Sequence, residues 1–170
     1  MITFKDFKNK RAELKGNRHQ YKELILTSIN NFIENYIDSL ELPAKSFQTE
    51  SHTHHPYVYV INENDRWGHS FDSLTIDKVD GATFVLYTVV DDEPPLPRPV
   101  ATRINVHVMD GELVYVLLED NQNNNVSVTI HSSDDLNAFS EIVKQSIILK
   151  IESEPLGKKT NADETVKLWD

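Results

Sequence analysis

The chain has 170 residues, a length that suits a single domain able to bury its own core without a disulfide or a metal. It contains no cysteine, and this excludes disulfide frameworks, thiolate zinc sites and cysteine nucleophiles. Its net charge of −10 argues against a general nucleic-acid-binding surface, because phosphate contacts require basic groups.

The charge is divided unevenly along the chain. Residues 1–22 hold seven basic and two acidic groups, which gives +5 and leaves −15 for the remainder. This acidity predicts a basic protein as partner, since complementary fields speed association and disfavour wrong partners. Nucleic acid is expected to make contact only through the basic N-terminal segment, which could also dock on the protein's own acidic surface or form a homodimer contact. The alternative is that acidity serves only solubility.

Two helices are predicted near the N-terminus. The first is short and basic, and it is expected to break at Gly16-Asn17, where helix propensity is poor. The second runs from Tyr21 to Leu40, where apolar residues recur at steps of three and four, and Pro43 follows closely to end it. The apolar residues of the first helix are Phe4, Phe7 and Leu14.

The middle of the chain predicts strands. Asp110-Gly111 between two alternating runs indicates a hairpin, because a type I′ turn requires positive φ at both central residues. A further turn at Asn123-Asn124 would place Ile130 beside Leu117. The predicted strands are Tyr57–Ile61, Leu74–Val79, Ala82–Val90, Val100–Met109, Glu112–Glu119 and Val126–His131.

A second long helix is predicted after His131, because residues 132–135 supply a cap and negative charge for its first turn. The pattern as a whole predicts an α+β fold: an antiparallel sheet of about five or six strands, with a long N-terminal helix and a C-terminal helix packed on one face. Residues 1–152 are expected to form one domain, followed by a polar extension at 153–170. The apolar face of the last helix comprises Leu136, Phe139, Val143, Ile147 and Ile151.

The stretch SHTHHP, residues 51–56, is the candidate for metal chemistry. In an extended chain His52 and His54 point to the same side, and two imidazoles at that spacing can share a zinc ion if a third ligand joins them. Candidates for the third ligand are His69, Asp72 and His107. The other interpretation is a solvated, pH-sensitive loop.

Three further segments are candidates for partner binding. The first is the loop at 62–73, where Arg66 and Trp67 are of the residue types that dominate protein interfaces. The second is the acidic triplet 91–93 ahead of a proline-rich run, which is expected to act as a stiff connector between strands. The third is one face of the sheet, where an apolar row at Val114, Val116 and Leu118 lies between polar rows. The alternatives for this face are cover by the N-terminal segment and a pocket for a small ligand. The candidate partner-binding residues are Asp91, Asp92, Glu93, Trp67, Arg66, Arg103, Asn105, His107 and His131.

No phosphate-binding loop, dinucleotide fingerprint or nucleophile elbow is present, which favours a binding protein over an enzyme. No leader-like apolar region is visible and the apolar runs are strand-sized, so a cytoplasmic protein without membrane contact is expected. The predicted function is a small acidic protein-binding module, for example an immunity- or antitoxin-type inhibitor of a basic partner or a chaperone. The alternative is a metal-dependent enzyme or metal-binding regulator that uses His52 and His54, with zinc as the divalent metal.

Overall fold

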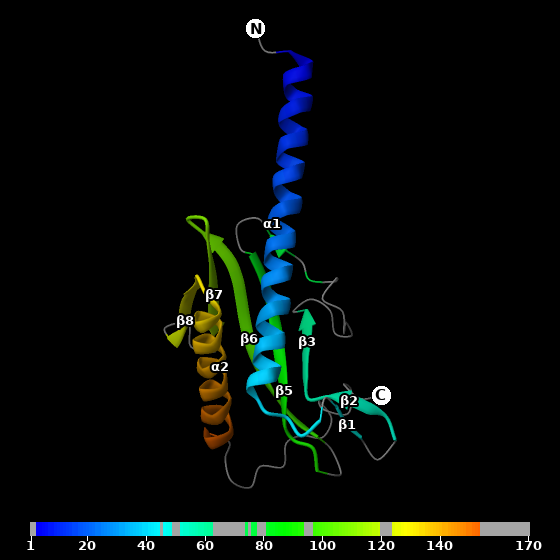
Figure 1. The fold of residues 1–170 in the computed structure, drawn as a ribbon, viewed down its shortest axis with the longest axis vertical. Helices are drawn as coiled ribbons and strands as arrows, with labels where there is room; N and C mark the ends of the chain where they lie inside the picture. Colours follow the sequence, from blue (N-terminus) through cyan, green and yellow to red (C-terminus); the bar gives the residue numbers. More distant parts are fainter. Residues whose placement is uncertain are drawn as a thin grey trace.

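A computed structural model describes residues 3–44, 46–48, 52–62, 74, 76–77, 81–93, 97–119 and 124–153. Over these residues the chain forms two helices, a two-stranded sheet and a six-stranded sheet, both sheets antiparallel, which confirms the predicted α+β class (Figure 1). The elements are α1 (Phe4–Ser39), β1 (Ser46–Gln48), β2 (His54–Pro56), β3 (Val58–Asn62), β4 (Ile76–Asp77), β5 (Gly81–Asp91), β6 (Arg98–Met109), β7 (Glu112–Leu118), β8 (Val126–Ile130) and α2 (Ser133–Ser153).

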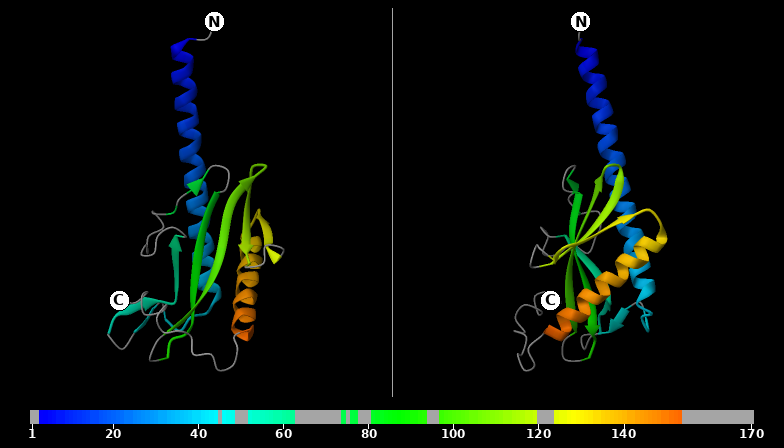
Figure 2. Two further views of the ribbon diagram at one scale, coloured as in Figure 1. Left: turned by 180° about the vertical axis from the view of Figure 1, so that it is seen from behind. Right: turned by 90° about the vertical axis from the view of Figure 1, so that its left-hand side faces the viewer.

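The larger sheet has the order β3-β5-β6-β7-β8, and the short β4 pairs with β5. Both helices cover the same face of this sheet (Figure 2). The core lies between the two helices and the sheet. Successive side chains of each strand point to opposite faces of the sheet, and those that face the helices are apolar. Its fully buried members include Ile25, Ile29, Phe32, Phe84, Leu86, Ile104, Val106, Tyr115, Phe139 and Val143.

The first helix differs from the prediction of two helices. It is continuous from Phe4 to Ser39, so the expected break at Gly16-Asn17 is wrong. A glycine inside a helix costs only about 1 kcal/mol relative to alanine, which is too little to end a helix that the packed residues beyond it sustain. Thr3 caps the helix, and Thr3 and Asp6 exchange the reciprocal hydrogen bonds of a capping box.

Only the second half of α1 belongs to the body of the protein. Residues 3–20 are all exposed, and this segment, called the arm below, projects beyond the sheet and α2 (Figures 1 and 2). Residues 25–36 instead bury five apolar side chains against the sheet and α2. Residues 3–20 therefore do not dock on the part of the acidic body that the structure describes.

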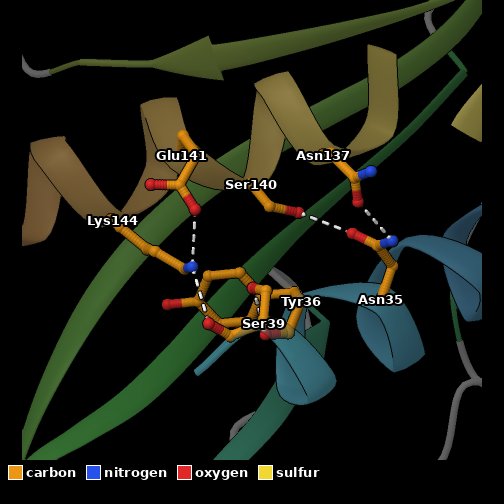
Figure 3. Close-up of polar contacts among 7 residues, drawn as sticks. All are labelled: Asn35, Tyr36, Ser39, Asn137, Ser140, Glu141 and Lys144. Atoms are coloured by element: carbon orange, nitrogen blue, oxygen red, sulfur yellow. Dashed lines mark hydrogen bonds and ion pairs between the residues drawn. The ribbon is translucent and has the colours of Figure 1, made fainter. Parts of the chain in front are cut away.

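A polar seam joins the two helices where α1 ends (Figure 3). Asn35 donates to Asn137 over 2.8 Å and accepts from Ser140 over 3.1 Å. Lys144 of α2 donates to the carbonyl of Ser39 over 2.8 Å. A cation at this position stabilises the exposed carbonyls and the negative end of the α1 dipole, for which α1 has no basic residue in its own last turn.

The hairpin between β6 and β7 confirms the predicted register. Val106 pairs with Tyr115, and Asp110 and Gly111 both have positive φ at the turn. The β7–β8 register is different from the prediction, because Leu117 pairs with Val126 and not with Ile130. The shift is four residues, an even number, so each side chain of β8 remains on its predicted face.

The charged start of α2 yields a pH prediction. Asp135 accepts hydrogen bonds from the backbone N–H groups of His131 and Ser132 and from the Ser132 hydroxyl, and these bonds lower the pKa of Asp135 below its ordinary 3.8. A carboxyl group with a lowered pKa in the folded state stabilises the fold above its unfolded pKa and loses that effect as pH falls through the folded value. We expect Asp135→Asn to be less stable than the parent at neutral pH, and we expect this difference to shrink as the pH falls below 3.8 and through the lowered pKa of Asp135.

Urea unfolding at neutral and at acidic pH measures this difference. The exposed Asp134→Asn variant is the control, because Asp134 lies in the same first turn of α2 and has the same charge. A gap between Asp135→Asn and the parent that stays constant with pH would contradict the assigned role of the Asp135 carboxylate.

Candidate interaction surfaces

The histidine cluster does not adopt the extended form that the metal hypothesis assumed. His52 has a φ of 63°, in the left-handed region, and it belongs to the segment that connects strand β1 to its partner β2 along the chain. His54 belongs to β2 and both side chains are exposed, while His55 is bonded to Thr53 over 2.8 Å. Among the described residues no three potential ligands gather at one point, and His69 and Asp72 lie outside those residues.

The small sheet that holds these histidines was not predicted, and it places them beside an apolar cavity. Phe47 of β1 packs on Tyr57, with a ring-centroid distance of 5.2 Å, and on His55 at 6.0 Å. The cavity has a volume of about 390 Å³, and its walls come from α1, β2 and β3. The lining residues are Ile33, Ile37, His54, His55, Pro56, Val58, Tyr59 and Val60.

The sheet face opposite the helices has the predicted rows. Asn105 and His107 of β6 lie beside Val116 and Val114 of β7. The polar residues form hydrogen bonds across and along the strands: Asn105 donates to Thr83 of the neighbouring strand β5 over 2.9 Å, and its side-chain carbonyl oxygen lies 2.7 Å from Nδ1 of His107 on β6. Val114 is buried and Val116 is half-buried, so this row is not an open apolar furrow.

The other candidate residues of that face lie on the central strand β6 and just after β8. Arg103 is exposed on β6 opposite Leu118. His131 follows the end of β8, and its Nδ1 lies 3.7 Å from an oxygen of Glu112, the first residue of the neighbouring antiparallel strand β7. Both of these side chains are more than half exposed, so the pair has little effect on stability.

The acidic triplet lies where β5 ends. Asp91, Asp92 and Glu93 are all exposed. Tyr57 donates a hydrogen bond of 2.5 Å to Asp92, and this bond is the main cause of the raised pKa of Tyr57. Asp91 also accepts a hydrogen bond of 3.0 Å from the backbone N–H of Glu93, so two of the three carboxylates are held at a defined place at the surface. Arg66 and Trp67, the other predicted partner-binding residues, lie outside the described residues.

The arm carries an uncovered apolar stripe, whose size was not evident from the sequence. Phe4 is 73%, Phe7 64% and Leu14 45% exposed. These residues are spaced in phase with Tyr21 and Ile25 of the same helix, so the stripe continues the core-facing side of α1 into solvent. Lys8 and Lys15 flank the stripe, as the helical repeat requires.

A groove between α2 and the end of the sheet was also missed. It has a volume of about 620 Å³ and runs between the C-terminal half of α2 and the paired ends of β7 and β8. Its lining residues are Leu117, Glu119, Asn124, Val126, Ile142, Gln145, Ser146, Leu149, Lys150 and Ser153. The sequence carried one signal for it: consecutive Ile147, Ile148 and Leu149 cannot all face one core, and the last two are 53% and 64% exposed.

Comparisons with protein-family models, curated proteins and solved structures found no match to this chain. Neither helix is long and apolar enough, over the residues the structure describes, to cross a membrane.

Proposed function

We propose that this protein is a protein-binding module whose acidic body engages a basic protein surface. One observation carries the proposal: the opposite charges of the chain are separated in space. Residues 1–22, which carry +5, include the projecting arm, and the arm does not cover the described part of the remaining chain, whose full sequence carries −15. The acidic body therefore keeps its field, and such a field steers basic partners towards it and repels acidic ones.

An immunity- or antitoxin-type inhibitor of a basic toxin, or a chaperone for a basic client, is a concrete form of this function. The exposed triplet Asp91–Glu93 is the contact that we assign to such a partner. Asp92 supports this role because its hydrogen bond from Tyr57 orders the carboxylate before any partner arrives. Ordered surface charges lose less entropy on binding than mobile ones.

Affinity capture with the full chain tests the function. Basic proteins are expected to be retained at about 0.1 M salt and released at about 1 M, where the screening length falls from about 10 Å to about 3 Å. The retained protein is then identified, purified and titrated against the parent and against a variant with Asp91→Asn, Asp92→Asn and Glu93→Gln. We expect the neutralised variant to bind about tenfold more weakly.

The matched control replaces Asp110→Asn, Glu112→Gln and Glu141→Gln, three exposed acids outside the triplet. It removes the same charge and is expected to bind nearly as well as the parent. Retention that does not depend on salt, or capture of acidic proteins only, would refute the proposed function.

A further inference from the structure

We propose that the arm of one chain docks in the groove between α2 and the β7–β8 edge of a second copy, so that two copies exchange arms. The inference rests on the proposed function and deepens it, because it names a second copy's arm as one basic partner of the acidic body. It explains two features that no other described residue covers, the apolar stripe of the arm and the groove at α2 with its mixed apolar and polar lining.

The arm does not bury its stripe against any other residue that the structure describes. Helix α1 is continuous through Gly16, and all residues from 3 to 20 are exposed. Phe4 and Phe7 near its tip are among the most exposed large apolar residues that the structure describes. An amphipathic face of this kind stabilises a protein only when another surface covers it.

Charge favours the acidic body of a second copy, and not its arm, as the surface that covers the stripe. Arg11 and Arg18 fall on the stripe itself, at the helical spacing that links Phe4, Phe7 and Leu14. Two arms paired along their stripes would bring these cations together, and each of the two paired segments carries +5. The remainder of a second copy carries −15 and attracts the arm.

The groove offers a fitting receptor for the stripe. Its apolar wall is formed by Leu117, Val126, Ile142 and Leu149, and Val126 and Leu149 are exposed. Glu119 lies in the same wall, where its carboxylate accepts a hydrogen bond of 2.7 Å from Ser146. Aromatic side chains in an apolar groove, with cations near a carboxylate, match the common helix-in-groove mode of recognition.

The lengths of the two helices are compatible with reciprocal exchange. Helical residues 4–20 extend about 26 Å, and the 21 residues of α2 extend about 32 Å. Helix α2 runs away from the end of the body where the arm leaves (Figure 1). Two copies can be related by a two-fold axis so that the ends from which the arms leave meet head to head. Each arm tip can then reach the C-terminal half of α2 in the other copy, and the dimer is closed.

A basic amphipathic helix can also lie on an anionic membrane. The acidic body argues against that partner, because an anionic lipid surface repels it. The two Arg residues within the stripe also narrow the apolar face that would enter the lipid. We therefore assign the arm to a protein surface and include vesicles in the test.

The first experiment measures the oligomeric state of the full chain by sedimentation velocity across protein concentration. We expect a dimer that dissociates more readily at about 1 M salt. Phe7→Glu with Leu14→Glu should weaken it by about 100-fold or more. The control, Asn9→Glu with Gln20→Glu, adds the same charge to the opposite side of the arm and should leave the dimer nearly intact. Since all four residues are exposed on the arm, these substitutions should not prevent the body from folding.

A matched pair of variants tests the groove. Leu149→Glu should dissociate the dimer, whereas Ile148→Glu should not, because both side chains are exposed but only Leu149 lines the groove. Since the chain contains no cysteine, oxidation of a mixture of the Lys8→Cys chain and the Gln145→Cys chain reports the contact directly. A disulfide between the two different chains is the expected product.

Four outcomes would overturn the inference. They are a monomer at all concentrations and salts, a Lys8→Cys chain that bonds mainly to its own kind, equal effects of Leu149→Glu and Ile148→Glu, and a monomer that binds phosphatidylserine vesicles through Phe7 and Leu14. A monomeric chain that still retains a basic protein through Asp91–Glu93 would leave the proposed function intact, so the two failures are distinguishable.

Discussion

Replacing Phe32 with alanine is expected to lower the free energy of unfolding by about 3–5 kcal/mol. Phe32 is fully buried, and its ring centroid lies 5.5 Å from that of Tyr115 in β7 and 5.4 Å from that of Phe139 in α2. It therefore joins α1 to the sheet and to the other helix. Truncation removes a large buried apolar area and leaves a cavity that three different elements cannot fill together.

Urea denaturation of the variant and the parent measures this loss. Met109→Ala is the control, because it removes an apolar side chain that is 57% exposed at the end of β6 and should change stability by less than about 0.5 kcal/mol. A cost below about 1 kcal/mol for Phe32→Ala would contradict the packing of α1 on the sheet.

The second large effect is expected at Gly81, the first residue of β5. Its φ is +71°, and a Cβ atom added there would lie 2.0 Å from the carbonyl oxygen of Val106 and 2.7 Å from the Cβ of His107. Both atoms belong to the central strand β6, so neither a side-chain rotation nor a small local shift relieves the clash. We expect Gly81→Ala to cost about 3 kcal/mol or more.

Gly16→Ala is the matched control in the arm. No atom lies within 4 Å of its added Cβ, and the helical backbone suits alanine. The variant should strengthen the local helix by about 0.5–1 kcal/mol, read as slower amide hydrogen exchange in the arm with unchanged global stability. Equal global effects of the two substitutions would show that the β5–β6 contact at Gly81 is wrongly assigned.

Elements with a strong local pattern were predictable. The stripe from Tyr21 to Leu40 combines helical spacing with a nearby proline, and Asp110-Gly111 lies between alternating runs, so periodicity and turn chemistry agree in both. The turn after β7 offered no such agreement. Residues 120–125 contain several Asn residues, any of which tolerates turn geometry, so the sequence did not distinguish registers that differ by an even number of residues.

The candidate surfaces were harder to predict, because they depend on how elements pack. Asp91, Asp92 and Glu93 could be named from composition alone, and the sequence also indicated the row of Asn105 and His107. The groove at Leu149 requires a helix and two strand ends that lie far apart in the sequence. The exposure of Phe4 and Phe7 depends on the direction in which α1 leaves the body, which no local pattern sets.

The continuity of α1 also bears on how the chain can change in evolution. The packed half of α1 nucleates the helix, and each further residue only extends it. Turns can therefore be gained or lost at the arm without disturbing the core. Insertion of seven residues would keep Phe4 and Phe7 nearly in phase with Ile25, whereas insertion of two would rotate them by about 200° to the other side. Length variation of the arm is thus tolerated in general, but a functional stripe restricts it to steps near whole heptads.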